Sequence, residues 1–236
     1  MLKLFFLFSL LVSYLYGVIS YKYNTFPLSI YREYLIVSPS NDYVCPISED
    51  RNASLKTLHK YTNFSNYGIL LGDSLFQGIY DTRPYGLEDY IILGQDGQTS
   101  KCLNNELNNY IKMKPKEIFL YIGGNDLDRS TPYLEVCKNI SEIAKKITNA
   151  KIPLTLHEIH YGLSTKRDPE SVLNTNKCIN EISKEYAEKV NIISTLPIFK
   201  FNTIEDISDV STDGEHLTHI GYKIWIKHIK KSIETF

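Results

Sequence analysis

The sequence has no marked excess of charge of either sign and no basic block. Its 26 lysines and arginines nearly balance its 27 aspartates and glutamates, so the formal net charge at pH 7 is −1. A nucleic-acid-binding protein normally displays a basic face and a positive net charge. We therefore do not expect nucleic acid to be a partner.

Internal repeats, low-complexity tracts and interior linkers are also absent from the sequence. With 236 residues, the chain is long enough for one well-buried core and too short for two ordinary domains joined by a linker. A hydrophobic fraction of 43% and a charged fraction of 22% are typical of a globular protein. The sequence therefore predicts one main domain.

Only one segment is apolar enough to span or cross a membrane, and it lies at the amino end. Lys3 is followed by an apolar run that continues to about Ile19, and Val18 and Ser20 occupy the positions that a signal peptidase reads. We predict a secretory signal peptide at residues 1–20, with an uncleaved anchor as the alternative. The expected location is secreted or periplasmic, and membrane contact is expected only if the anchor is retained.

No CxxC pair occurs among the four cysteines, which are Cys45, Cys102, Cys137 and Cys178. Zinc ligation would favour closer spacing, whereas an even number of scattered cysteines in an oxidising compartment favours disulfides. The sequence does not choose between the alternative pairings. It predicts disulfides without their connectivity.

Three Asn-x-Ser sequons begin at Asn52, Asn63 and Asn139. If the source organism glycosylates its exported proteins, we expect these asparagines on exposed loops or helix faces. In an organism that does not, they are ordinary polar residues.

From residue 67 onward, apolar runs alternate with helical patterns. Strands are expected at 67–72, 90–94, 117–122, 153–159 and 190–194, and helices at 99–112, 132–149, 170–188 and 218–234. Near-continuous apolar strands that alternate with helices are typical of a parallel sheet covered on both faces. We predict an α/β fold at residues 67–236, a three-layer α/β/α sandwich with a mainly parallel five-stranded sheet. Residues 21–66 are expected to form an extension packed on this core.

A Gly-Asp-Ser-Leu sequence at residues 72–75 ends the first apolar run. A buried strand followed by this turn of small residues would place the hydroxyl of Ser74 at the carboxyl edge of the sheet, where open α/β folds bind ligands. Acyl transfer from an ester requires such a nucleophile, together with a base and donors for the developing oxyanion. On its own, the motif also fits a serine that only caps the next helix.

An Asp-Gly-Glu-His-Leu sequence at residues 213–217 supplies the candidate base. Because a loop after the last strand also opens on the carboxyl edge, we expect His216 to face Ser74. Asp213 can then hold the other ring nitrogen and stabilise the imidazolium. The alternatives are a solvated loop histidine with a capping aspartate, or a metal site that also includes His219. A metal site would leave the other candidate residues unexplained.

Candidate donors for an oxyanion follow the second and third expected strands. The backbone N–H of Gly97 can approach a substrate closely because glycine has no side chain. Asn125, in the Gly-Gly-Asn-Asp sequence at residues 123–126, offers a neutral amide donor. The backbone N–H of Ser74 would be a third donor. Gly94 is an alternative to Gly97, and each residue could instead serve only its turn.

Together, the three motifs and Gly97 resemble the SGNH (GDSL) hydrolase family over about residues 67–225. The resemblance implies a flavodoxin-like sheet and an esterase, lipase or carbohydrate deacetylase that uses neither a metal nor a cofactor. It implies a catalytic set formed by Ser74, Asp213 and His216, and an oxyanion hole formed by Ser74, Gly97 and Asn125. It also implies that Asp73 and Asp126 shape their turns rather than catalyse. The long segment before the first strand departs from the family pattern.

The resulting expectation is a serine esterase that forms an acyl-enzyme on Ser74. Short acyl groups are favoured, with O-acetyl groups on carbohydrate as the expected substrate, because no long apolar lid or acyl-chain tunnel follows the motifs. A lipid esterase or lysophospholipase and a carbohydrate O-acyltransferase would use the same residues. From another class, the chain could be a glycan-binding module on an inactive scaffold, although such a module has no need of all these positions.

A second histidine pair, His157 and His160, invites comparison with a metal site. Both histidines belong to or adjoin the strand expected at 153–159. On a continuous strand, residues three apart point to opposite faces of the sheet. We therefore expect no metal at this pair.

Overall fold

The computed structural model describes residues 45, 60, 62–82, 87–161, 166–186, 188–196, 199, 209–211 and 213–233, with the backbone alone for 80–82. The predicted signal peptide or anchor at 1–20 and nearly all of the predicted extension at 21–66 lie outside these residues. Among the residues that are described, no helix is long and apolar enough to cross a membrane.

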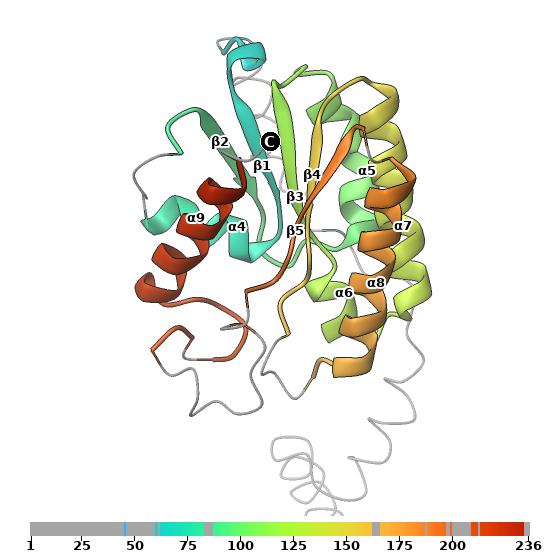
Figure 1. Ribbon diagram of the computed structural model, residues 1–236, viewed down its shortest axis with the longest axis vertical. Coiled ribbons are helices and arrows are strands. Elements are labelled where there is room, and N and C mark those ends of the chain that lie inside the picture. Colours follow the sequence, from blue (N-terminus) through green and yellow to red (C-terminus); the bar gives the residue numbers. More distant parts are fainter. Residues whose placement is uncertain are drawn as a thin grey trace, which may run out of the picture. The chain divides into compact units, whose positions relative to one another are not determined.

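The described strands form one parallel sheet (Figure 1). In chain order the strands are β1 (Gly68–Gly72), β2 (Tyr90–Gly94), β3 (Glu117–Tyr121), β4 (Leu154–His157) and β5 (Val190–Ile193). Their spatial order is β2-β1-β3-β4-β5, and every neighbouring pair is parallel. From β1 the chain first adds β2 on one side and then returns to add β3 on the other side, so the strand order switches between β1 and β3. Open α/β folds bind ligands at the carboxyl ends of the strands at such a switch point. The predicted parallel five-stranded sheet is confirmed.

Alternate residues of the central strands pack on opposite faces of the sheet. In β1, Ile69 and Leu71 belong to one hydrophobic core, whereas Leu70 belongs to the other. All three side chains have no exposed surface. Because both faces are covered, these strands are apolar at every position rather than at every second one.

Helices cover both faces of the sheet, as Figure 1 shows. One face is covered by α5 (Ser100–Ile111), α7 (Tyr133–Asn149) and α8 (Pro169–Glu185), and the other by α4 (Ser74–Thr82) and α9 (His219–Ile233). The short helix α6 (Gly124–Asp128) follows β3. The predicted three-layer α/β/α sandwich is thus confirmed.

Two disulfides link segments of the described chain. They join Cys45 to Cys102, at the start of α5, and Cys137 to Cys178, which connects α7 to α8. The predicted formation of disulfides is therefore confirmed. The connectivity comes from the structure alone.

The strand expected at 153–159 is shorter than predicted, because β4 ends at His157. The side-chain oxygen of Asn176, on α8, accepts the backbone N–H of Ile159 at 2.8 Å, and its amide nitrogen donates to the carbonyl of Ile159 at 2.9 Å. This asparagine replaces the neighbouring strand as the hydrogen-bond partner of Ile159. The chain therefore leaves the sheet two residues earlier than its apolar pattern suggested.

Candidate active site

Ser74 is the first residue of α4, and only Asp73 separates it from the end of β1. The turn depends on Gly72, because a Cβ there would lie 2.0 Å from the carbonyl oxygen of Tyr121 in β3. The carboxylate of Asp73 then accepts the backbone N–H of Leu75 at 3.0 Å, which satisfies one free donor of the first helical turn. The hydroxyl of Ser74 is thereby fixed at the carboxyl edge of the sheet.

Asp73 is buried beneath this turn, with 3% of its surface exposed. Burial is the dominant influence and raises the pKa of Asp73 to about 7, although the N–H of Leu75 and the charge of Arg167 act in the opposite direction. Its carboxyl group therefore holds a proton far more readily than an ordinary aspartate does. Its hydrogen bond to Leu75 agrees with the turn-shaping role that the family resemblance implied.

A tight turn before α9 places His216. The hydroxyl of Ser211 donates to the carbonyl of His216 at 2.6 Å and accepts the N–H of Gly214 at 2.9 Å. One carboxylate oxygen of Asp213 accepts the backbone N–H groups of Glu215 at 2.9 Å and His216 at 2.7 Å. The Asp-x-x-His spacing thus forms a closed turn in which the aspartate holds the backbone of the histidine.

The same turn brings three of the predicted site residues together. The Nε2 atom of His216 lies 3.1 Å from the Oγ atom of Ser74, and its Nδ1 atom lies 2.7 Å from the second carboxylate oxygen of Asp213. When Nδ1 carries the ring proton, Nε2 can accept the hydroxyl proton of Ser74. The geometry is that of a nucleophile, a base and a group that orients the base.

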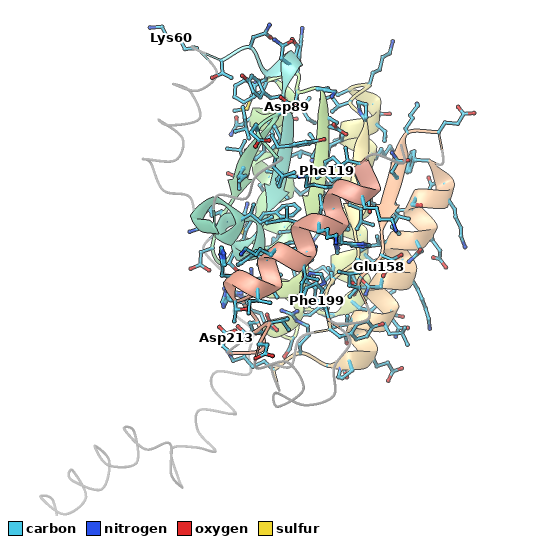
Figure 2. All side chains as sticks on the ribbon, turned by 60° about the vertical axis from the view of Figure 1, so that its left-hand side comes forward. Lys60, Asp89, Phe119, Glu158, Phe199 and Asp213 are labelled. Carbon is cyan, nitrogen blue, oxygen red and sulfur yellow. A yellow bond between two sulfur atoms is a disulfide. The ribbon has the colours of Figure 1, made fainter. Side chains whose placement is uncertain are left out.

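The carboxylate of Asp213 is held in its charged form. Partial burial would raise its pKa, but the backbone N–H and the ring of His216, together with the N–H of Glu215, lower that pKa to about 2. Figure 2 shows Asp213 near the lower end of α9, at the opposite edge of the sheet from Asp89, which precedes β2. The negative charge therefore lies at the edge where β1 delivers Ser74.

The segment that contains Gly97 is attached to the turn of the serine. The N–H of Gln95 donates to the carbonyl of Gly72 at 2.9 Å, and the N–H of Asp96 donates to the Oε1 atom of Gln77 at 2.6 Å. Gly97 itself has a positive φ of 69°, which favours glycine. The loop between β2 and α5 is therefore held against the first turns of α4.

The alternative residue Gly94 has a packing role. A Cβ on Gly94 would lie 2.2 Å from the backbone nitrogen of Gln77 and 2.7 Å from the carbonyl of Asp73. No side chain fits between β2 and α4 at this point. The close approach of these two elements thus accounts for the glycine at 94.

Asn125 lies in α6, immediately after β3. Gly123, with a φ of 114°, provides the left-handed turn from the strand into this helix. The side-chain nitrogen of Asn125 donates to the carbonyl of Gln98 at 3.0 Å, so the segments that carry Asn125 and Gly97 touch. An amide nitrogen has two N–H groups, and no residue in the described part of the chain accepts the second.

The backbone N–H of Ser74 is also placed as a donor. The first N–H groups of a helix have no partner within the helix. None of the hydrogen bonds formed by the described residues uses this N–H, whereas the N–H groups of Leu75 and Gln77 are both bound by Asp73. Helix geometry thus leaves a donor beside the hydroxyl oxygen of Ser74.

A buried network that the sequence did not reveal links α6, which carries Asn125, to the start of α5. Asp126 accepts the backbone N–H of Ser100 at 2.8 Å and its hydroxyl at 2.7 Å. The side-chain amide of Asn139, on α7, donates to the same hydroxyl at 3.0 Å. Asp126 therefore joins α6 to the start of α5.

The Asn139 amide is engaged in this network, so the structure argues against an exposed sequon at Asn139, whereas Asn63 is exposed.

Arg167 fixes the other side of α6. Its Nε atom donates to the carboxylate of Asp128 at 3.0 Å, and its guanidinium also contacts the second carboxylate oxygen of Asp128. A further N–H of Arg167 donates to the carbonyl of His160 at 3.2 Å. Both members of the ion pair are largely buried, with 8% and 13% of their side-chain surfaces exposed. No sequence motif indicated this pair.

The pair of histidines at 157 and 160 does not have the predicted orientation. Because β4 ends at His157, the two rings are not on opposite faces, and their centroids lie 5.1 Å apart. The indole N–H of Trp225 donates to the Nε2 atom of His157 at 2.8 Å, and the Nδ1 atom contacts the carbonyl of Glu158. Burial is the dominant influence and lowers the pKa of His157 to about 3. His157 is therefore a neutral part of the core between β4 and α9.

In the described residues, no group of three or more His, Cys, Asp or Glu side chains is arranged to hold a metal ion. His216 is instead hydrogen-bonded to Asp213 through one ring nitrogen and to Ser74 through the other. His219 begins α9 and lines a cavity next to them. This cavity of about 450 Å³ also contacts Ser74, His216, Gln77, Gly78, Asp96, Leu217 and Tyr222.

Comparison with known proteins supports the fold assignment. No family model matches the sequence. The chain is similar to a solved GDSL-like lipase of Bacteroides thetaiotaomicron, with a TM-score of 0.66 and 21% identity over 79% of this chain and 97% of that one. The chain has the fold of the SGNH hydrolases. The resemblance read from its motifs is thus confirmed over most of the chain.

Two further solved structures that resemble this chain carry the names of esterases. The psychrotrophic esterase EstA of a Pseudoalteromonas species has a TM-score of 0.56 and 19% identity, over 72% of this chain and 97% of that one. The acetyl xylan esterase AlAXEase has a TM-score of 0.56 and 15% identity, over 70% of this chain and 99% of that one. These similarities concern the fold.

A relative is also found by sequence. A protein of Acetivibrio thermocellus named "Putative endoglucanase X" is 34% identical over 145 residues, which are 57% of this chain. The match spans 58% of the length of that relative. Neither the SGNH fold nor this partial match identifies a substrate.

Proposed function

We propose that this protein is a serine ester hydrolase of the SGNH type. The observation that carries the proposal is the continuous hydrogen-bonded chain from Ser74 Oγ to His216 Nε2, at 3.1 Å, and from His216 Nδ1 to Asp213, at 2.7 Å. These residues are separated by up to 142 positions in the sequence, so local capping does not account for their meeting. A nucleophile, a base and an orienting carboxylate in this order are the requirement for acyl transfer.

In the proposed reaction, the Oγ atom of Ser74 attacks the ester carbonyl while His216 takes its proton. Asp213 stabilises the resulting imidazolium, and the developing oxyanion is bound by the N–H groups of Ser74 and Gly97 and the amide of Asn125. His216 returns the proton to the leaving alkoxide, which departs as an alcohol. Water then attacks the acyl-enzyme by the same steps and releases the carboxylic acid.

For the substrate, we propose short acyl esters, with O-acetyl groups on carbohydrate as the first class to test. One solved structure with the same fold is named as an acetyl xylan esterase, and the relative found by sequence is named as an endoglucanase. The cavity beside Ser74 supports a polar substrate, because Gln77, Asp96 and His219 line it. No cofactor or metal is required by the proposed steps.

Lipid esters are the second candidate, because one similar solved structure is named as a GDSL-like lipase. A carbohydrate O-acyltransferase would use the same three residues and replace water by a sugar hydroxyl. A glycan-binding module without catalysis has no need of the contact between Ser74 and His216. A series of esters with growing acyl chains separates the first two candidates.

The two disulfides support an oxidising location for the protein. We propose secretion or export to the periplasm, with residues 1–20 as the predicted signal peptide. This assignment is tested by sequencing the amino end of the protein recovered outside the cytoplasm. Recovery with residues 1–20 intact in the membrane fraction would instead support the anchor.

The experiment that tests the activity combines p-nitrophenyl acetate hydrolysis with labelling by a fluorophosphonate. Wild-type protein should hydrolyse the ester and become labelled, whereas Ser74→Ala and His216→Ala should lose both properties. His228→Ala is the matched control, because the ring of His228 bonds to the carbonyl of Ser194, away from the catalytic pair. Equal rates for wild type and Ser74→Ala would reject the proposed function for this substrate class.

A further inference from the structure

The cavity beside Ser74 lies on one side of the nucleophile. The described residues that line it come from α4, from the loop after β2 and from residues 216–222, and they include the catalytic imidazole. Neither Gly97 nor Asn125 is among these lining residues. The cavity therefore opens on the imidazole side of Ser74.

The position of the imidazole decides which part of an ester can occupy this cavity. His216 must return its proton to the oxygen of the leaving alcohol, so that oxygen has to lie within hydrogen-bond reach of Nε2. We infer that the cavity is the subsite for the leaving alcohol, and that Asp96 and Gln77 select an alcohol rich in hydroxyl groups, such as a sugar. The inference rests on the proposed esterase function and assigns the specificity of that same site.

Gln77 and Asp96 have the chemistry needed to bind hydroxyl groups. The Oε1 atom of Gln77 is already used, because it accepts the backbone N–H of Asp96 at 2.6 Å. This bond fixes the side chain and leaves its amide nitrogen as a donor. In the described part of the chain, no group is hydrogen-bonded to the carboxylate of Asp96, which can accept two hydroxyl protons from neighbouring positions of a sugar ring.

The remaining walls fit the less polar faces of such a ring. Leu217 and Tyr222 line the cavity with apolar surface, while Asp96 and Gln77 are exposed. Gly78 has no space for a side chain, because a Cβ there would lie 2.0 Å from the hydroxyl oxygen of Tyr222. A cavity of about 450 Å³ with these walls has room for one sugar unit next to the serine.

The test keeps the acyl group constant and changes only the alcohol. Values of kcat/KM are measured for a monoacetylated methyl glycoside and for ethyl acetate, with wild type, Asp96→Ala and Gln77→Ala. The ratio of the two values should fall about tenfold in Asp96→Ala, because a hydrogen bond to a charged group is lost only with the sugar ester. Asp89→Ala, at the opposite edge of the sheet in Figure 2, should keep the wild-type ratio.

A second comparison, of ethyl acetate with ethyl butyrate, checks the assignment of the cavity to the alcohol. The acetate-to-butyrate ratio should change less than twofold in Asp96→Ala. A large change in this ratio, or an unchanged glycoside-to-ethyl ratio in an active and folded variant, overturns the inference while the esterase function stands. Absence of all ester hydrolysis in folded wild type overturns the function first, and the subsite with it.

Discussion

The carboxylate of Asp213 binds His216 twice, through the backbone N–H at 2.7 Å with one oxygen and through ring atom Nδ1 at 2.7 Å with the other. One side chain thus sets both the fold of the turn and the orientation of the ring. The two functions can be separated by a substitution that preserves shape. An asparagine at this position keeps one carbonyl oxygen but replaces the other oxygen with an N–H donor.

We expect Asp213→Asn to lower kcat on the order of 10³- to 10⁴-fold. The amide can still accept the backbone N–H of His216, but its NH₂ group disfavours a proton on Nδ1, so Nε2 would carry the proton and could not accept one from Ser74. Steady-state rates on p-nitrophenyl acetate measure the effect, and circular dichroism checks the fold. Asp209→Asn, in the same loop, is the control. A loss below tenfold would contradict the role of Asp213.

We expect Asn125→Ala to lower kcat about 10²- to 10³-fold with little change in KM. The lost amide would remove one donor from the oxyanion, whose charge exists only in the transition state. The control is Asn109→Ala, at an exposed position of α5. If the loss of activity in Asn125→Ala were explained by a smaller folded fraction, the main role of Asn125 would be structural, through its hydrogen bond to the carbonyl of Gln98.

We expect the stability of the protein to fall between about pH 4 and pH 7 through the titration of Asp73. Burial raises its pKa from the ordinary value of 3.8 to about 7, so the folded state retains a proton that the unfolded chain has released. The stabilisation by protonated Asp73 is complete below about pH 4 and is lost as pH rises to about 7, by about 4 kcal/mol. Asp73→Asn should remove this dependence.

Urea unfolding of wild type and Asp73→Asn at several pH values measures the difference. The comparison is needed because other buried groups also respond to pH. His157, with a pKa lowered to about 3, destabilises the fold as pH falls through and below its usual titration range, and does so in both proteins. Parallel pH curves for the two proteins would contradict the raised pKa of Asp73.

We expect Arg167→Ala to lower the free energy of unfolding by about 3 to 5 kcal/mol. The change would leave the largely buried carboxylate of Asp128 without its cation and the carbonyl of His160 without a donor. The double variant Arg167→Met with Asp128→Leu should recover much of the loss, because no unpaired charge remains. Chemical denaturation measures all three proteins, with Arg129→Ala, an exposed neighbour, as the control. If Arg167→Ala and Arg129→Ala lowered the free energy of unfolding by similar amounts, the buried ion pair would not be the source of the stabilisation.

The sheet and the meeting of Ser74, Asp213 and His216 were predictable because their signals in the sequence are strong and local. Apolar runs placed β1, β2 and β3 within a residue of their observed bounds. β1 and β3 are buried on both faces, so nearly every position in them is apolar. The short helix α6 was not predicted, because five residues are too few to show a helical period. The turn at 213–217 was recognisable because one aspartate and one histidine lie close in sequence.

The supporting contacts could not be read from the sequence, because they join residues far apart. The end of β4 is determined by Asn176, which lies 17 residues after Ile159. Arg167 and Asp128 are separated by 39 positions and have no pattern in common. Long-range polar contacts of this kind depend on which helices become neighbours, and periodicity does not encode that choice.

The packing of Trp225 has a practical consequence. It is the chain's only tryptophan, it has no exposed surface, and it belongs to α9, the helix that begins three residues after His216. Its indole is hydrogen-bonded to His157 and stacks on Phe76 of α4, the helix that begins with Ser74. Its fluorescence emission therefore reports on the packing of α4 against α9, and a red shift would signal that the two helices have separated and exposed the indole to water.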